Sequence, residues 1–123
     1  MVYEKESFKG RSMTLAIYRN CSFIACDFSG CTLSHCLFES CSFDRCSFKD
    51  CTIRFTGLAL CSLNSCIFFS CDLFGSSFEG SQLQSCRFED TNLARCSFLL
   101  AKLADTAFPL SNLAYCMYAS EKL

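Results

Sequence analysis

The cysteines are the residues of this chain whose number and spacing first suggest chemistry. There are 13 of them among 123 residues, a density typical of disulfide scaffolds or metal-binding domains. Zinc ligands, however, come as closely spaced pairs, usually together with histidine. Neighbouring cysteines in this chain are always a multiple of five residues apart, and His35 is the single histidine. The spacing therefore predicts no metal centre and no cofactor.

Disulfide bonds are not expected either. Stacked strands would hold these cysteines about 4.8 Å apart with parallel side chains, whereas a disulfide needs Cβ atoms about 3.8 Å apart that converge. Each thiol is predicted to be reduced and buried, as a small hydrophobic group between larger side chains. A redox or metal-binding role is the less favoured alternative.

Catalytic groups are not assembled in this sequence. His35 has no carboxylate pair that its spacing would bring to the same face. Gly30, Gly75 and Gly80 stand alone at positions that suit turns and do not form a phosphate-binding loop. A packed repeat of this kind also offers no cleft in which a pKa would be perturbed. The chain is therefore predicted not to be an enzyme.

A strict repeat of five residues explains the cysteine spacing. Every fifth residue from Tyr3 to Leu123 is large and apolar. A second series, two residues earlier in each unit, holds all the cysteines, and its other members between Ala16 and Cys116 are Ala, Ser or Thr. Neither a helix nor a flat strand has a period of five, so the chain must turn a corner once per unit.

A longer period of twenty residues is superimposed on the short one. Phenylalanine recurs at this interval from Phe8 to Phe108, and aliphatic residues recur from Met13 to Leu113. Like residues would stack on like in a square coil with one unit on each side. The sequence thus predicts a repeat architecture in which each coil packs only on its neighbours.

These units resemble the pentapeptide-repeat family, whose loose pattern is A(D/N)LXX. Residues 26–30, 71–75 and 91–95 fit the pattern closely, and the resemblance covers essentially the whole chain. It implies an all-β fold, a right-handed quadrilateral β-helix of about six coils with four five-residue sides. It also implies that the large residue and the small residue of each unit point inward. This chain departs from the pattern by preferring cysteine to alanine and phenylalanine to leucine.

The repeat predicts a single domain over residues 1–123. Residues 1–20 are expected to form a degenerate N-terminal capping coil, because Glu6 and Arg11 occupy positions that are small further along, where a charge is tolerable only near solvent. Residues 21–120 should form regular coils, in a rod about 29 Å long. Both ends of such a rod expose strand edges.

Composition narrows the partners that this protein can have. With 12 acidic and 11 basic residues the net charge is −1, which does not suit direct nucleic-acid binding. No apolar run approaches the roughly 18 residues of a membrane span, and the first residues lack the apolar core of a signal peptide. We therefore expect a cytoplasmic protein that contacts neither nucleic acid nor membrane.

The candidate sites are apolar residues outside the inward register. Exposed apolar groups of this kind often mark interaction surfaces; the alternative is that they lie flat and shield the backbone. The candidate partner-binding residues are Phe55, Ile67, Phe69 and Phe74. A C-terminal group comprises Leu99, Leu100, Leu110, Tyr115 and Met117, and the candidate interface of an end-to-end homodimer comprises Leu110, Tyr115, Met117, Tyr118 and Leu123.

Two functions are compatible with these features. The first is a rigid, non-enzymatic protein–protein interaction or scaffold module. The second rests on a resemblance to the quinolone-resistance pentapeptide-repeat proteins, which implies DNA mimicry and binding to DNA gyrase or topoisomerase IV. A rod of about 29 Å that imitates duplex DNA would need roughly 17 negative charges, whereas this chain has a net charge of −1. The charge favours the first function.

Overall fold

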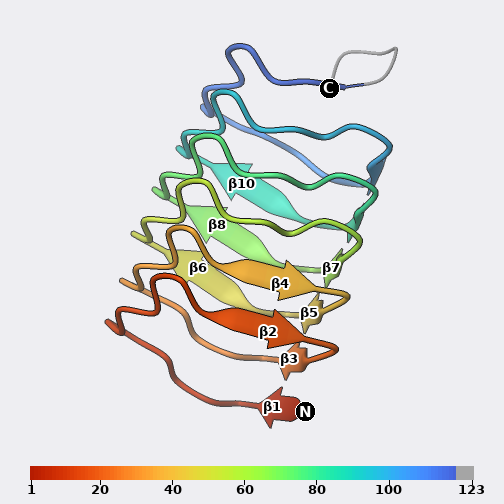
Figure 1. Ribbon diagram of the computed structural model, residues 1–123. Coiled ribbons are helices and arrows are strands. Elements are labelled where there is room, and N and C mark those ends of the chain that lie inside the picture. Colours follow the sequence, from red (N-terminus) through yellow and green to blue (C-terminus); the bar gives the residue numbers. More distant parts are fainter. Residues whose placement is uncertain (119–123) are drawn as a thin grey trace.

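The computed structural model describes residues 1–118 as a rod of stacked coils (Figure 1). Its strands are only three residues long, because the chain turns a corner after every fifth residue. They are β1 Val2–Glu4, β2 Ile17–Arg19, β3 Ser22–Ile24, β4 Leu37–Glu39, β5 Ser42–Asp44, β6 Ser47–Lys49, β7 Ser62–Asn64, β8 Ile67–Phe69, β9 Gln82–Gln84, β10 Arg87–Glu89 and β11 Lys102–Ala104. Among residues 1–118, no helix is long and apolar enough to cross a bilayer.

Each coil has four sides and contains twenty residues; coil 1 is residues 1–20, coil 2 residues 21–40, and so on. The first side is a 6-stranded sheet, ordered β1-β3-β5-β7-β9-β11. The second side carries β6, β8 and β10, and the fourth carries β2 and β4. The third side is held by isolated bridges such as Thr52↔Asp72. The six strands of the first side mark five full turns, so the predicted β-solenoid is confirmed.

The register between coils is the twenty-residue period of the sequence. All paired strands are parallel, with Tyr3 opposite Phe23 and Phe43 opposite Leu63. Backbone amides bond alternately to the coil after and the coil before. The Phe28 amide donates to the Ser47 carbonyl at 2.8 Å, and the Asp27 amide donates to the Glu6 carbonyl at 3.0 Å. Because this ladder runs on every side, interior coils leave few backbone groups unpaired.

The core consists of the two inward series that the sequence predicts. Phe23, Phe28 and Leu73 are fully buried, and so is nearly every cysteine. Phenylalanine rings stack along the rod at 4.4–5.1 Å between ring centroids, from Phe8 to Phe108. Rings on neighbouring sides meet edge to face, as Phe23 and Phe28 do at 5.5 Å. Stacked and edge-to-face rings are both favourable arrangements, so the core gains from geometry as well as from burial.

The last residue of every unit turns the corner in the left-handed region. Its φ lies between 48° and 72° at each such position from Lys5 to Tyr115, and only Gly10, Gly30, Gly75 and Gly80 are glycines. Glycine is favoured there because other residues bring Cβ into strain. At Gly75 a second constraint applies, since an added Cβ would lie 2.6 Å from the ring of Phe55 in the coil before.

Gly75→Ala is therefore expected to destabilise the rod by about 2–3 kcal/mol, through backbone strain and this close contact together. Gly30→Ala is a matched control: Gly30 has a similar φ of +69°, but its nearest contacts would be at 3.8 Å. It should lose only about 1 kcal/mol. Urea unfolding measures both. In a Phe55→Ala background the two substitutions should cost the same, and a persisting difference would contradict the contact.

The two ends of the rod differ in polarity. In coil 1 the inward small positions are taken by Glu6 and Arg11, both exposed, and the core residues Tyr3 and Tyr18 are half-buried. Inward charges of this kind protect an open strand edge from pairing with another chain. At the other end of the described residues the corresponding positions hold uncharged residues such as Thr106 and Ser111, which do not give this protection.

Candidate functional site

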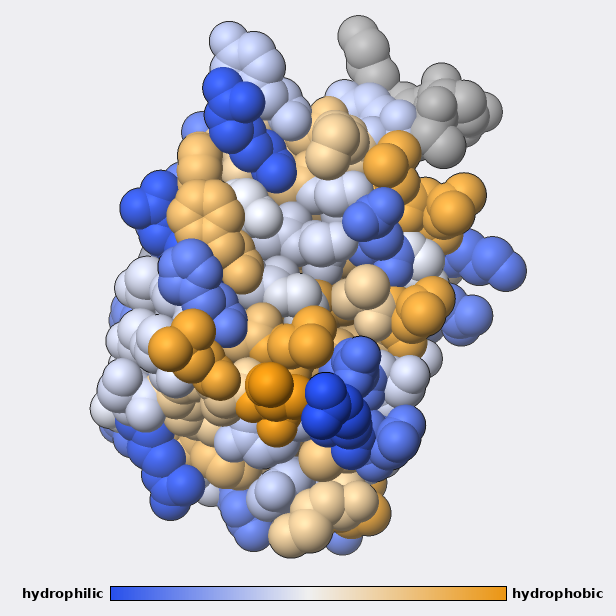
Figure 2. Space-filling view, viewed as in Figure 1, coloured by the Kyte–Doolittle hydropathy of each residue, from blue (hydrophilic) through white to orange (hydrophobic). Residues whose placement is uncertain are grey.

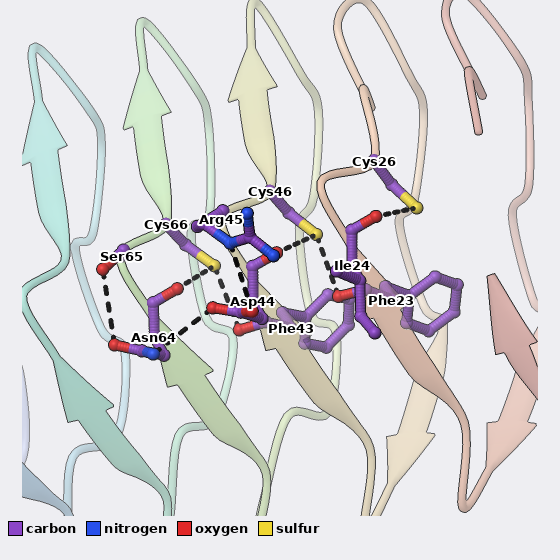
Figure 3. A network of polar contacts seen from close by, with 10 residues as sticks. All are labelled: Phe23, Ile24, Cys26, Phe43, Asp44, Arg45, Cys46, Asn64, Ser65 and Cys66. Atoms are coloured by element: carbon purple, nitrogen blue, oxygen red, sulfur yellow. Dashed lines mark hydrogen bonds and ion pairs between the residues drawn. The ribbon is translucent and has the colours of Figure 1, made fainter. Parts of the chain in front are cut away.

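The cysteine side chains do more than fill space. The thiol of Cys46 lies 3.3 Å from the carbonyl oxygen of Phe23, one coil earlier, and Cys66 lies at the same distance from that of Phe43 (Figure 3). The same link to the residue 23 positions earlier recurs along the rod, at 2.8–3.4 Å, for Cys26, Cys31, Cys36, Cys41, Cys51, Cys61, Cys71, Cys86, Cys96 and Cys116. Each of these thiols therefore donates a hydrogen bond to the coil before it.

Hydroxyl groups make the same bond where serine or threonine replaces cysteine. Ser76 donates to the Ile53 carbonyl at 2.6 Å and Thr91 to the Phe68 carbonyl at 3.2 Å. Among the described residues no buried side-chain nitrogen or oxygen lacks a partner. The small position thus favours a short side chain with a donor, although Ala16 and Ala101 lack one; the sequence analysis treated the thiols as purely apolar groups and did not recognise this preference.

Burial makes several of these thiols poor nucleophiles. Desolvation raises the pKa of Cys61 to about 11 and that of Cys96 to about 12. Hydrogen bonding with Cys46 and Cys86, together with burial, raises the pKa of Cys66. Since the thiolate is the reactive species, thiols with a raised pKa suit a structural role rather than a reactive one. Among residues 1–118, no three His, Cys, Asp or Glu side chains are placed to share a metal ion.

A thiol-reactive dye should therefore label the native protein slowly and substoichiometrically. Twelve cysteines are buried and Cys116, in the last coil, is half-buried, so Cys116 should react first. All 13 cysteines should react in denaturant. Mass spectrometry after timed labelling provides the order of reaction. Rapid native labelling of Cys66 or Cys71, in the middle of the rod, would contradict this packing.

Of the candidate partner-binding residues, Phe55 and Phe74 lie together. Their rings meet edge to face, with 5.6 Å between the ring centroids. His35, exposed at the same corner one coil earlier, stacks on Phe55 at 5.4 Å. The guanidinium of Arg54 lies over both rings, 4.7 Å from Phe74 and 5.7 Å from Phe55. The carboxylate of Asp72 forms an ion pair with Arg54, with 3.6 Å between Oδ2 and Nε. This cluster combines exposed aromatic and arginine groups, the residues enriched at binding hot spots.

Ile67 and Phe69 lie elsewhere, on the outer surface of β8 on the second side. Ile67 is exposed, whereas Phe69 is half-buried and has Lys49 of the coil before it 5.8 Å from its ring centre. The structure therefore presents two pairs on adjacent sides of the rod. Phe69 and Phe74 are half-buried, which partly fits the alternative that these rings lie flat against neighbouring side chains.

The C-terminal candidates occupy the last two coils. Leu110 is 86% exposed, the most of any large apolar residue within 1–118, and Tyr115 and Met117 are also exposed. Tyr118 points inward but is half-buried. Arg95 lies 4.8 Å from the ring centre of Tyr115, so this end too combines an aromatic group with a cation. Leu123 lies outside the described residues.

One apolar surface was missed by the sequence analysis. It covers the fourth side and the corners that bound it, where Leu15, Ile17, Leu60 and Leu100 are exposed. Figure 2 shows hydrophobic side chains gathered on this face. In the sequence these residues are scattered over coils 1 to 5, and only the twenty-residue stacking places them on the same side. Sorting the outward positions by column would have revealed the surface.

The comparisons with known families agree with this geometry. The profile of the SV2A/B/C luminal domain family matches residues 4–88, and that of pentapeptide repeats (8 copies) matches residues 71–108. No sequence among the curated proteins matches the chain.

Two solved structures show the same architecture at low sequence identity. The pentapeptide repeat protein Rfr23 from the cyanobacterium Cyanothece 51142 superposes with a TM-score of 0.87 at 14% identity, over 92% of this chain and 91% of that one. A trypsin-treated variant of QnrB1, a plasmid-mediated fluoroquinolone resistance protein, superposes with a TM-score of 0.58 at 18% identity, over 94% of this chain and 70% of that one.

With its five-residue units, inward thiols and stacked rings, this chain belongs to the pentapeptide-repeat family, and over residues 4–88 to the family of the SV2A/B/C luminal domain.

Proposed function

We propose that this protein is a rigid, non-enzymatic module that binds other protein chains through its outer surface. The observation that supports this most directly is the set of exposed apolar and aromatic residues outside the inward register, of which Phe55 and Tyr115 each lie beside an arginine. The thiols are occupied in holding coils together. A family whose members are generally non-catalytic is consistent with this role.

The C-terminal end is the first contact surface that we propose. Core residues there are only half-buried, as at Phe108 and Leu113, whereas Phe88 and Leu93 one coil earlier are fully buried. An open strand edge beside apolar side chains favours association. A second copy related by a two-fold axis, the commonest oligomeric symmetry, would cover this strand edge. Glu6 and Arg11 disfavour pairing at the opposite end.

The expected result is a dimer by light scattering, where one chain has a mass of 13.8 kDa. Tyr115→Lys with Met117→Lys should weaken this dimer at least about tenfold, because lysine charges would be buried against the partner end. Both side chains are exposed, so circular dichroism should be unchanged. Glu6→Lys with Val2→Lys, at the opposite end, is the matched control and should leave the dimer intact. A dimer unaffected by the C-terminal substitutions would exclude this end.

DNA mimicry is less well supported by the charge distribution. Acidic and basic residues alternate on the sides of the rod, as in the pairs Arg19–Glu39 and Arg45–Asp44. The fold that this chain shares with QnrB1 says nothing about a shared target. A DNA gyrase supercoiling assay with and without a quinolone tests the point, and we expect no effect of the protein at micromolar concentration.

A further inference from the structure

The first three coils of the fourth side form an apolar surface with a hollow in it. Leu15, Ile17 and Leu60 are 71%, 56% and 70% exposed. In coil 2 the half-buried Leu37 lies against Gly57 of coil 3, and the next outward position of coil 3 is the small Ala59. A groove of about 420 Å³ runs past Leu37, Ala59 and Leu60. Figure 2 shows this face, with hydrophilic side chains beside the apolar ones.

The charged residues of this side are arranged unevenly along the rod. One outward column reads Arg19, Glu39, Ala59 and Glu79 in coils 1 to 4. Arg19 forms an ion pair with Glu39. Glu79 is exposed and, within residues 1–118, has no ion pair. Arg19 and Glu79 are three coils apart, or about 14 Å at the spacing of paired strands.

We propose that this side pairs with the same side of a second copy, with the two rods antiparallel. A two-fold axis that crosses the rod between coils 2 and 3 sets coil 1 against coil 4 and coil 2 against coil 3. Arg19 then faces the partner's Glu79, and the same contact is formed a second time by symmetry. Leu60 faces the partner's Ser40, so that a large exposed side chain meets a small one.

Charge disfavours the two registers that lie half a coil to either side of this one. An axis moved by half a coil to the level of coil 3 would set Glu39 against the partner's Glu79, and one at the level of coil 2 would set Glu39 against its own copy. Like charges placed opposite each other suppress such registers. An axis between coils 1 and 2 would match Arg19 with the partner's Glu39 but would overlap only two coils. The register that we propose overlaps four.

A second copy is favoured over an unrelated partner because the complement of each feature lies on the same side of this chain. A two-fold interface must be self-complementary: where a residue i contacts residue j of the partner, residue j also contacts residue i of the partner. Arg19 of coil 1 faces Glu79 of coil 4, which has no ion pair among the described residues, and the exposed Leu60 faces the small Ser40. The surface does not include Tyr115 or Met117, so it is separate from the C-terminal end.

Charge reversal in a protein with a disabled C-terminal end tests this pairing. In the Tyr115→Lys, Met117→Lys background, sedimentation at about 200 µM should still show a monomer–dimer equilibrium. Arg19→Glu or Glu79→Arg alone should weaken that dimer about tenfold or more, because each sets like charges against each other. The double variant Arg19→Glu, Glu79→Arg should recover to within about threefold of the background protein. Unchanged circular dichroism shows that each variant remains folded.

Each result discriminates between the surfaces. A background protein that stays monomeric overturns the lateral pairing and leaves the C-terminal contact standing. A wild-type dimer that ignores Tyr115→Lys and Met117→Lys but responds to Arg19→Glu supports the lateral pairing and excludes the end. Two single variants that weaken the dimer without recovery in the double variant overturn the antiparallel register, as does a dimer that neither single variant changes.

Discussion

Leu73→Asp is expected to unfold the rod. The Leu73 side chain is 0% exposed and is stacked between Ile53 and Leu93, also buried, at the centre of the third side. The substitution removes the burial of a leucine, worth about 3 kcal/mol or more, and adds a carboxylate without a partner. The total loss should exceed about 5 kcal/mol, which is comparable to the whole stability of a domain of this size. Far-UV circular dichroism and thermal melting measure it.

Two controls make this result specific to the inward register. Leu100→Asp introduces the same change at an exposed corner with a φ of 61°, a conformation that aspartate tolerates well; it should change stability by less than about 1 kcal/mol. Phe74→Asp, one residue from Leu73, should also remain folded, with the modest loss of the contact between Arg54 and the Phe74 ring. Unfolding by Phe74→Asp without unfolding by Leu73→Asp would show that the assignment of inward and outward positions is wrong.

The inward frame was predictable because its two physical requirements are both visible in the residue types. Large residues recur at every fifth position and small ones two positions earlier, and both series are buried. The twenty-residue column of phenylalanines from Phe8 to Phe108 even predicted the register, because rings stack on rings. The frame of a repeat fold can be predicted in this way because every unit packs against its neighbours in the same manner.

The outer surface was predictable only in part, because its residues interact across coils and corners. The stacking of His35 on Phe55 and the position of Arg54 over two rings depend on how corner side chains lean. The close approach of Phe55 to Gly75 depends on it too. The repeat itself places Ile67 and Phe69 on one side and Phe55 and Phe74 on the adjacent side, but the contacts that these side chains make depend on such orientations. No local pattern of five residues carries this information.

The burial of the cysteines leads to the second large effect, a loss of stability in alkali. In the folded protein burial raises the pKa of Cys61 to about 11 and that of Cys96 to about 12, whereas an unfolded thiol ionises near about 8.5. Between these values the unfolded chain holds fewer protons than the folded one, so stability falls as pH rises. It is retained below about pH 8.5 and is lost progressively up to about pH 12, by about 1.4 kcal/mol per pH unit for each such thiol.

Serine substitution separates this effect from the titration of lysine and tyrosine. Ser76 and Ser81 occupy the inward small position in the same columns as Cys96 and Cys61 and donate to the preceding coil, so Cys61→Ser with Cys96→Ser should preserve the fold near pH 7 within about 2 kcal/mol. A hydroxyl does not ionise in this range. Urea unfolding under reducing conditions at pH 7, 9 and 10.5 should therefore show the wild type losing several kcal/mol across the series. The double variant should lose distinctly less, and equal losses in the two proteins would mean that these thiols stay neutral or that other groups control the alkaline transition.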